Sequence, residues 1–409
     1  MEIYRNIQNH IKTLLNQFPI VAIIGARQSG KTTLSKLLCP DWLYVDLENP
    51  GDFDRINYDP LLFFEQNSHN VIIDEAQILP DLFPILRGII DNDRQAKGRF
   101  ILTGSSSPDL LKNISESLAG RIAYIELPTL KTNEFNQTKL SEFYNILSST
   151  HKIDDFHNLK TSISLKNINQ HWLYGGYPEP RINGKKDFWL NWIEQYNNTY
   201  INRDISLLFP KLNKINFRRF LQILTTLSNT IINKSDLARD LEISQPTIHE
   251  YLEIVSGTFI WRNLPSYESK KIKSIIKMPK GYIRDSGLLH FLNKIFELEH
   301  LYNNIIVGRS FEGFIIEEII KGIQAQGIIG CDYYHYRTRG GAEIDLILEG
   351  NFGLIPIEIK YSSHTTIKQL RSLTDFIRTH NLNYGIVINQ AKEITKLTKN
   401  IIQIPANFL

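Results

Sequence analysis

Residues 19–38 read PIVAIIGARQSGKTTLSKLL, and this stretch decides the fold. Its apolar run at residues 20–24 predicts a buried strand, and a helix is expected to begin near Lys31. The loop between them has the pattern G-x-x-x-x-G-K-[ST], in which the glycines let backbone N–H groups wrap phosphates and the helix dipole points at them. We therefore expect ATP to bind at Gly25, Ala26, Arg27, Gln28, Ser29, Gly30, Lys31, Thr32 and Thr33.

A second apolar run, NVIIDEAQ at residues 70–77, ends in Asp74 and Glu75 where a strand should finish. In P-loop NTPases an aspartate at this place holds magnesium together with the loop hydroxyl, here Thr32, and an adjacent glutamate polarises the attacking water. The alternative is a strand end capped by two solvated carboxylates. Because the phosphate loop lies upstream, we interpret Asp74 as a magnesium ligand and Glu75 as the catalytic base of ATP hydrolysis.

A third apolar run, RFILTGSSS at residues 99–107, ends in hydroxyl residues. Thr103 or Ser105 is placed to sense the γ-phosphate, as polar residues at that strand end do in many ATPases. Arg121 comes just before a further expected strand, IAYIE. Such an arginine can neutralise transition-state charge on the nucleotide of a neighbouring chain, which would require a homo-oligomer. The alternative for Arg121 is a surface arginine.

Length and composition limit the class of protein. A chain of 409 residues predicts two or three domains, and 42% hydrophobic with 22% charged residues is typical of soluble globular proteins. The net charge of +3 is small, so a nucleic-acid surface must be a local patch. Two distant cysteines, Cys39 and Cys331, exclude a disulfide framework and fit a reducing cytoplasm. No signal peptide or membrane-spanning run is apparent, so we expect a cytoplasmic protein without a membrane partner.

The stretch from residue 232 to 256 has the apolar spacing of a helix–turn–helix, with its turn near residues 242–244. The second helix is expected to start at Gln245, and residues 259–283 are expected to form a two-stranded wing rich in lysine. A winged helix on duplex DNA would direct polar side chains to base edges and wing lysines to phosphates. The expected DNA contacts are Gln245, Thr247, His249, Lys270, Lys271 and Lys273, with Lys277 and Lys280 in the same wing. The alternative is a winged helix that serves only in packing.

Three acidic residues and a lysine recur in order near the end of the chain. Glu312 stands near the start of an amphipathic helix over residues 307–327, Asp345 follows on a strand, and Glu358 and Lys360 follow on the next. Glu358 and Lys360 alternate on one strand, so their side chains point to the same face. We expect Glu312, Asp345 and Glu358 to hold magnesium with the carbonyl of Ile359, and Lys360 to orient or activate water against a phosphodiester. The alternative is a half-buried strand pair whose charges face solvent.

This order of residues resembles the PD-(D/E)XK nuclease fold, and the intervals resemble those of archaeal Holliday-junction resolvases. The proline of the motif name is missing, because Ala342, Glu343 and Ile344 precede Asp345. The resemblance implies a nucleic-acid-binding α/β domain. Cleavage is a separate expectation, since the fold is often kept as a binding platform.

Several stretches together resemble a large prokaryotic family of AAA-type ATPases whose C-terminal domain is of unknown function. The resemblance rests on GARQSGKTTL, VIIDEAQILPDLFPILRGIID, FILTGSSS, LAGR, GGYPEP, YINRDI, GYIRDSGLLHFL, VGRSFEGFIIEEI and YRTRGGAEIDLIL, which span nearly the whole chain. It implies an α/β architecture with a P-loop ATPase domain at 1–135, a helical lid or connector at 136–205, a winged helix at 206–298 and a nuclease-like domain at 299–409.

The expected function is that of a magnesium-dependent ATPase coupled to DNA binding and to metal-dependent DNA cleavage. The expected cofactors are ATP and Mg²⁺, and the expected partners are DNA and further copies of the chain. A nucleotide-switched DNA- or protein-binding module with an inactive nuclease fold is the alternative. The sequence leaves open the DNA structure that is recognised, the size of the oligomer and the biological process.

Overall fold

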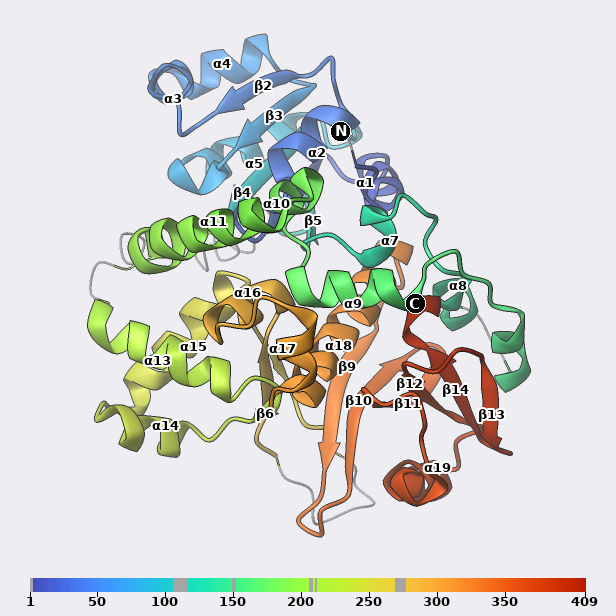
Figure 1. Ribbon diagram of the computed structural model, residues 1–409. Helices are drawn as coiled ribbons and strands as arrows, with labels where there is room; N and C mark the ends of the chain where they lie inside the picture. Colours follow the sequence, from blue (N-terminus) through green and yellow to red (C-terminus); the bar gives the residue numbers. More distant parts are fainter. Residues whose placement is uncertain (1–2, 106–116, 149–151, 206–208, 210–211, 269–276) are drawn as a thin grey trace. The chain divides into compact units, whose positions relative to one another are not determined.

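The computed structural model describes residues 3–105, 117–148, 152–205, 209, 212–268 and 277–409 (Figure 1). The chain divides into two compact units. The N-terminal unit consists of Tyr4–Thr129 with Gly257–Phe259. The C-terminal unit consists of Met1–Ile3, Leu130–Ser256 and Ile260–Leu409. It therefore contains the ranges expected for the lid, the winged helix and the nuclease-like domain, except for Gly257–Phe259.

The N-terminal unit is built on a five-stranded parallel sheet with the order β2-β3-β4-β1-β5. Its strands are β1 (Ile20–Gly25), β2 (Leu43–Asp46), β3 (Val71–Asp74), β4 (Phe100–Ser105) and β5 (Ile122–Glu126). Its helices are α1 (Gln8–Leu15), α2 (Lys31–Leu38), α3 (Pro50–Asn57), α4 (Pro60–Gln66), the short 3-10 helix η1 (Ala76–Ile78) and α5 (Leu82–Asn92).

Strand β1 is buried along its whole length because helices cover both faces of the sheet. Its alternate residues Ile20 and Ala22 belong to a core shared with α3, α4 and α5, and Val21 belongs to a second core with Ile11 of α1 and Leu34 of α2. A parallel strand buried on both faces needs a continuous apolar run, which is what residues 20–24 supply. The expected strand–loop–helix order around the phosphate loop is therefore confirmed.

The carboxyl ends of the parallel strands place the predicted nucleotide residues along one edge of the sheet. Gly25 ends β1, Asp74 ends β3 and Ser105 ends β4. Because β3, β4 and β1 are consecutive neighbours in the sheet, these ends lie side by side. In open parallel sheets this edge is where ligands bind.

The C-terminal unit contains a six-stranded mixed sheet with the order β13-β14-β12-β11-β10-β9 and a three-stranded sheet with the order β6-β8-β7. Its strands are β6 (Thr230–Ile231), β7 (Trp261–Leu264), β8 (Lys280–Ile283), β9 (Asp332–Arg337), β10 (Glu343–Gly350), β11 (Gly353–Ile359), β12 (Gly385–Asn389), β13 (Thr395–Thr398) and β14 (Ile401–Pro405). Strands β10 and β11 follow one another as the sequence predicts, and they pair as an antiparallel hairpin in which Leu346 is opposite Ile357 and Gly350 is opposite Gly353.

The helices of the C-terminal unit come mostly before the large sheet. They are α7 (Thr132–Phe135), α8 (Glu142–Leu147), η2 (Ile153–Asn158), α9 (Leu165–Tyr174), α10 (Pro178–Asn183), α11 (Lys186–Tyr196), the π-helix η3 (Asn197–Asp204), α13 (Lys214–Thr226), α14 (Lys234–Leu241), α15 (Gln245–Gly257), α16 (Ser286–Leu292), α17 (Leu298–Tyr302), α18 (Val307–Gln326), η4 (Ile367–Leu370), α19 (Arg371–His380) and η5 (Ala406–Phe408). Within the described ranges, none of these or of the N-terminal helices combines the length and the apolar character that crossing a bilayer requires.

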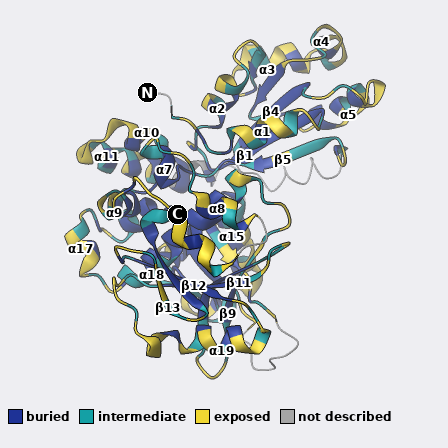
Figure 2. Cartoon of the chain, turned by 90° about the vertical axis from the view of Figure 1, so that its right-hand side faces the viewer, coloured by how far each residue is buried: buried dark blue, intermediate teal, exposed yellow. Residues whose placement is uncertain are grey.

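The two long faces of the large sheet carry different cores. Leu346 and Leu348 of β10 pack into a core that includes buried residues of α18, and Ile347 between them packs with Leu373 and Phe376 of α19. Figure 2 shows β11 and β12 in the buried colour, and α19 with an exposed outer face. The core that contains α18 also contains buried residues of α9, α11, α13 and α15, so it joins the large sheet to the helices that precede it in the chain.

One buried histidine of this core makes stability depend on pH. His290 of α16 is fully buried, with Nδ1 2.9 Å from the Leu173 carbonyl oxygen and Nε2 2.6 Å from Ser310 Oγ. A carbonyl only accepts, so Nδ1 carries the hydrogen and the neutral ring is satisfied at both nitrogens. Burial lowers the pKa of His290 to about 4, although the hydrogen bond with Leu173 opposes that shift.

Because the folded pKa lies below the unfolded value, the contribution of His290 is complete above pH 6.5 and is lost as pH falls toward 4. We expect the free energy of unfolding to fall by up to about 1.4 kcal/mol per pH unit from this group in that window. A His290→Gln variant should be less stable at pH 7 but should lose less on acidification, as measured by urea unfolding. The exposed histidine of α17 supplies the control, because His300→Gln should keep the wild-type slope. Equal slopes for His290→Gln and wild type would contradict the prediction.

Candidate functional site

The phosphate loop has the backbone that its glycines were expected to provide. Gly30 has φ 93° and Gln28 has φ 65°, so the chain turns through two left-handed positions before α2 begins. At Gly25 a Cβ atom would lie 2.3 Å from the Leu127 carbonyl oxygen, so no larger residue fits. Arg5, which sequence reasoning missed, braces the loop by donating to the carbonyl oxygens of Ser29 at 3.0 Å and Pro128 at 2.6 Å.

Lys31 is buried against the loop at the start of α2. Its Nζ donates to the carbonyl oxygens of Gly25 at 3.2 Å and Ala26 at 3.1 Å. Burial lowers the pKa of Lys31, and the nearby carboxylates of Glu75 and Asp74 oppose that shift. The ammonium group therefore lies where the loop would surround a phosphate.

Three hydroxyl groups donate hydrogen bonds to the Asp74 carboxylate. Its Oδ2 accepts from Thr32 Oγ1 at 2.7 Å and from the Tyr44 hydroxyl at 2.7 Å, and its Oδ1 accepts from the Thr103 hydroxyl. The structure thus brings together Thr32, Asp74 and Thr103 as predicted. Tyr44 was missed, although its place in β2 beside β3 was a usable signal. Burial and the hydrogen bond to Asp74 raise the pKa of Tyr44 well above its usual range.

Glu75 adopts a left-handed backbone with φ 54°, a conformation that non-glycine residues rarely take and that often marks functional sites. Its Oε2 accepts from the Ser105 backbone N–H at 2.9 Å, from Ser105 Oγ at 2.8 Å and from Gln77 Nε2 at 2.5 Å. Ser105, expected to sense the γ-phosphate, therefore holds the expected catalytic carboxylate in this structure. Burial raises the pKa of Glu48, a further missed residue, and the charge of Glu75 adds to that shift.

Arg121 is engaged within its own unit. Its Nε and Nη2 donate to the two carboxylate oxygens of Asp91 at 2.9 and 2.8 Å, and its Nη1 donates to the Ala119 carbonyl oxygen at 3.0 Å. The hydrogen bond to Asp91 raises the pKa of Arg121. A role in a neighbouring chain stays a prediction, and it would require Arg121 to leave Asp91.

The second group of predicted residues lies in the C-terminal unit, at the open end of the β10–β11 hairpin, away from its turn. Asp345 is buried, and its Oδ2 accepts from the Ile359 backbone N–H at 2.9 Å. Lys360 Nζ lies 2.6 Å from Glu358 Oε1 and 4.0 Å from Asp345 Oδ2. Burial raises the pKa of Glu358 to about 8, and the charge of Asp345 adds to that shift. The structure therefore brings Asp345, Glu358 and Lys360 together as predicted.

Lys280 corrects the expectation of a lysine-rich wing. The sequence places it among lysines that contact phosphates, but its side chain is only 2% exposed. Its Nζ lies 3.4 Å from Glu312 Oε2, from Glu343 Oε1 and from Asp345 Oδ1. Burial alone would lower the pKa of Lys280, but these carboxylates outweigh it and raise the pKa above its usual value. Glu343 was also missed, although it alternates with Asp345 on β10 and so shares its face.

The predicted metal ligands are arranged around lysines and not around one common point. In the described part of the chain, no group of three or more His, Cys, Asp or Glu side chains is gathered to hold a metal ion. The Lys280 ammonium lies 3.4 Å from both Glu312 Oε2 and Asp345 Oδ1. Burial raises the pKa of Glu312 to about 7, and the charge of Asp345 adds to that shift.

The predicted DNA-reading helix begins at Gln245 as expected, and α14 ends at Leu241 before a turn in which Glu242 has φ 57°. Gln245 and His249 are exposed, and Thr247 is half-buried with its backbone N–H 3.2 Å from Ser244 Oγ. Gln245 Nε2 donates to Ser235 Oγ at 3.0 Å. In the expected wing, Lys277 is exposed and pairs with Glu268 at 2.8 Å. Lys270, Lys271 and Lys273, which were predicted to contact DNA, lie outside the described residues.

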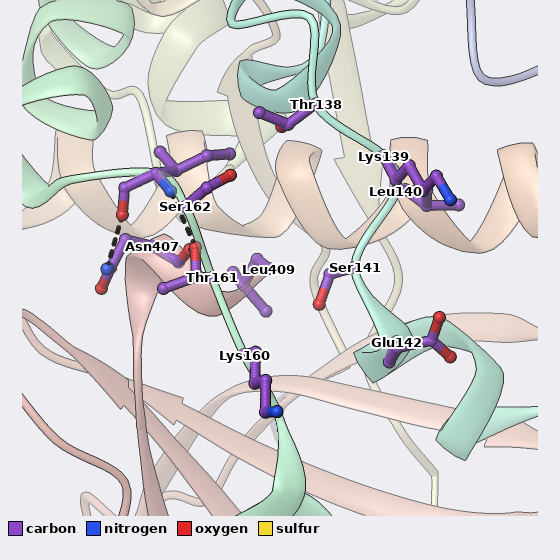
Figure 3. A pocket seen from close by; sticks show the side chains of 11 residues that line it. Thr138, Lys139, Leu140, Ser141, Glu142, Lys160, Thr161, Ser162, Asn407 and Leu409 are labelled. Atoms are coloured by element: carbon purple, nitrogen blue, oxygen red, sulfur yellow. Dashed lines mark hydrogen bonds between the residues drawn. The ribbon is translucent and has the colours of Figure 1, made fainter.

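A separate pocket of about 510 Å³ lies in the C-terminal unit between three segments at 138–142, 160–163 and 407–409 (Figure 3). Lys139 and Lys160 line it with several hydroxyl groups. Asn407 closes one side by donating from Nδ2 to the Ile163 carbonyl oxygen at 2.8 Å. None of the predicted site residues lines this pocket, so it has no part in the chemistry considered for the two sites.

Three segments of the chain match known domain families. Residues 17–136 match an AAA domain, residues 165–299 a domain of unknown function (DUF8612) and residues 307–409 a domain of unknown function (DUF4143). Among solved structures, the Walker-type ATPase PABY2304 of Pyrococcus abyssi is 15% identical with a TM-score of 0.43, covering 70% of this chain and 94% of that one. The Holliday junction branch migration motor RuvB of Thermotoga maritima is 16% identical with a TM-score of 0.31, covering 64% and 90%.

Relatives with similar length are known in bacteria and archaea. The uncharacterized protein MJ1544 of Methanocaldococcus jannaschii is 22% identical over 411 residues, covering 95% of this chain and 86% of that one. The uncharacterized protein Rv2008c of Mycobacterium tuberculosis is 30% identical over 406 residues, covering 98% of this chain and 83% of that one. In this chain an AAA domain is followed by two domains of unknown function. The chain belongs to the same family as the uncharacterized protein Rv2008c.

Proposed function

We propose that this chain is a magnesium-dependent ATP hydrolase whose C-terminal unit binds DNA and cleaves it at a carboxylate–lysine site. The observation that carries the ATPase part is the 2.7 Å hydrogen bond between Thr32 and Asp74, beside Lys31 and Glu75. These are the groups that P-loop ATPases use, and they converge at the edge of the sheet where nucleotides bind.

The residues present fit both ATP and magnesium. Magnesium prefers oxygen ligands, and the Thr32 hydroxyl with the Asp74 carboxylate supplies them. The loop from Gly25 to Thr33 would hold the phosphates, with the Lys31 ammonium exchanging its loop carbonyl partners for phosphate oxygens. Magnesium would withdraw charge from those oxygens when bound.

Glu75 is placed to act on the attacking water. Its carboxylate is held by Ser105 and Gln77, which fix its position at the end of β3. A carboxylate that accepts a proton from water increases the nucleophilicity of that water at the γ-phosphate. Thr103, which donates to Asp74, would keep the aspartate oriented.

The proposal of metal-assisted phosphodiester hydrolysis in the C-terminal unit is supported by the proximity of Asp345, Glu358 and Lys360. Asp345 and Glu358 would hold a divalent cation, which polarises phosphate oxygens and water. Lys360, 2.6 Å from Glu358, would orient the water or neutralise charge on the phosphate. The backbone N–H of Ile359 fixes the orientation of the Asp345 carboxylate.

The proposed DNA contacts come from α15 and the segment after β7. The exposed side chains of Gln245 and His249, with Thr247, would approach base edges, and Lys270, Lys271 and Lys273 would approach phosphates. The proposed assembly is a homo-oligomer in which Arg121 could leave Asp91 to reach the nucleotide of the next chain.

A second candidate is a nucleotide-switched DNA- or protein-binding module whose nuclease-like site does not cut. The observation that favours it is the Lys280 ammonium between Glu312 and Asp345, where a metal ion would otherwise be held. A permanent cation at that place neutralises the carboxylates without supplying an activated water. Whether the site binds a divalent cation therefore distinguishes the two candidates.

Changing Glu75 to glutamine tests the ATPase part. The amide keeps the size of the carboxylate but cannot accept the proton, so turnover should fall by roughly 10²-fold or more. Binding of a fluorescent ATP analogue should persist, because Lys31, Thr32 and Asp74 are intact. Phosphate release with and without DNA is the measurement, and Glu65→Gln on the exposed side of α4 is the matched control. Near-normal phosphate release by Glu75→Gln would remove Glu75 from the catalytic role.

A further inference from the structure

We infer that Lys280 is a fixed cation of the C-terminal site, which therefore takes one divalent cation, at Asp345 and Glu358, and not two. The inference rests on the proposed function of that site. It identifies Lys280 as a positioning residue and specifies how many metal ions the site binds. Lys280 lies on β8, far in sequence from the helix and hairpin that carry the carboxylates.

The distances around Lys280 are those of a shared ion. Its Nζ lies 3.4 Å from one oxygen of each of three carboxylates, on Glu312 of α18 and on Glu343 and Asp345 of β10. These distances exceed the roughly 2.7–2.9 Å of a tight charged hydrogen bond, as expected when one ammonium is divided among three partners. The side chain is held there because all four residues of β8 are buried between β6 and β7.

Charge balance then limits how many metal ions the site can take. The carboxylates of Glu312, Glu343, Asp345 and Glu358 face three cationic side chains, those of Lys280, Lys360 and Arg337. These cations already offset most of the negative charge that the carboxylates can supply. A second divalent cation beside the Lys280 ammonium would therefore gather uncompensated positive charge in a mostly buried place, and such charge is costly in low dielectric.

The carboxylate oxygens that have the fewest partners indicate where that single ion fits. Glu312 Oε2 already receives Asn229 Nδ2 at 2.5 Å as well as Lys280, and Glu343 Oε2 lies 3.7 Å from Arg337 Nη1. By contrast, Glu358 Oε2 is buried and has no hydrogen-bond partner among the described residues. Asp345 Oδ2 accepts from the Ile359 backbone N–H and faces Lys360, away from the Oδ1 that Lys280 contacts, and its remaining lone pair is available to an ion.

Lys280 acts in this site through the carboxylates. Because it contacts Glu312 and Glu343, these carboxylates would not be available to the ion, whereas Asp345 would hold the ion through the oxygen that Lys280 does not contact. Because the ammonium is covalently attached, a chelator cannot remove it. Its loss should therefore free the Glu312 side of the cluster to bind a second ion.

Calorimetric titration of the full chain with Mn²⁺ tests this inference. The titration uses an Asp74→Asn background, so that the nucleotide site does not contribute ions. With Lys280 intact we expect one ion per chain, and with Glu358→Gln added we expect none. With Lys280→Met we expect two ions, whereas Lys277→Met, which changes an exposed lysine of the same segment, should leave one.

Two ions bound with Lys280 intact, or one ion bound by Lys280→Met, would overturn the inference. The first of these outcomes needs no folded Lys280 variant, so a failure of Lys280→Met to fold leaves the inference open to refutation. DNA cleavage measured on the Lys280-intact protein separates the failure of the inference from that of the proposed function. Two ions with magnesium-dependent cleavage would overturn only the inference, and one ion without cleavage would overturn only the cleavage. No bound ion would overturn both.

Discussion

Replacing Lys31 with alanine should abolish ATP hydrolysis and weaken nucleotide binding. Lys31 is the cation that the phosphate loop encloses, with its Nζ 3.2 and 3.1 Å from the carbonyl oxygens of Gly25 and Ala26. Removing a preorganised charge of this kind costs roughly 10²–10³-fold in rate. Phosphate release at saturating ATP and the affinity for a fluorescent ATP analogue are the two measurements.

The variant should remain folded, because Lys31 contacts only backbone carbonyls of its own loop among the hydrogen bonds described for it. Lys12→Ala is the matched control, since Lys12 is an exposed lysine of α1 in the same unit. It should hydrolyse ATP like the wild type. Hydrolysis by Lys31→Ala above a tenth of the wild-type rate would contradict the assignment of the nucleotide site.

The second large effect is expected at Asp345. Asp345→Asn should abolish DNA cleavage and divalent-cation binding in the C-terminal unit, because an amide oxygen keeps the hydrogen bond from Ile359 but loses the negative charge. Loss of such electrostatic stabilisation is worth roughly 10²-fold or more in rate. ATP hydrolysis should continue, since the phosphate loop, Asp74 and Glu75 belong to the other compact unit.

Three assays on the same preparation test these expectations for Asp345→Asn. They are Mn²⁺ titration for cation binding, DNA cleavage, and phosphate release for ATP hydrolysis. Asp332→Asn on the exposed end of β9 is the control and should leave them unchanged. If Asp345→Asn still cut DNA at the wild-type rate, the hairpin would not be the cleavage site. If it cut no DNA and also hydrolysed no ATP, the loss would not be specific to the C-terminal site.

The parts that the sequence predicted correctly depend on local patterns. A continuous apolar run before a glycine loop is sufficient to place β1, the loop and α2, because a parallel strand covered on both faces needs such a run. Asp74 and Ser105 could be placed together because the ends of parallel strands share one edge. The β10–β11 hairpin was predictable from alternating residues around the turn near Gly350.

The parts that were missed depend on pairings between distant segments. Lys280 belongs to a lysine-rich stretch and gives no sign of burial in its own neighbourhood. It becomes buried because β8 is the central strand of the small sheet, and its three carboxylate partners come from residues 312–345. Arg121 was placed correctly before β5, but its partner Asp91 lies at the end of α5 and follows from no periodicity. Tyr44 likewise meets Asp74 only through the pairing of β2 with β3.

Incubation of the wild-type chain with labelled branched, single-stranded and duplex DNA is the most direct test of the proposal that the chain both hydrolyses ATP and cuts DNA. Each DNA is offered with magnesium or with EDTA, and with or without ATP, and phosphate release is followed in the same tube. We expect at least one DNA structure to be cut in magnesium and none in EDTA. If every DNA stayed intact while ATP was hydrolysed, cleavage would be contradicted and the C-terminal unit would be a binding module.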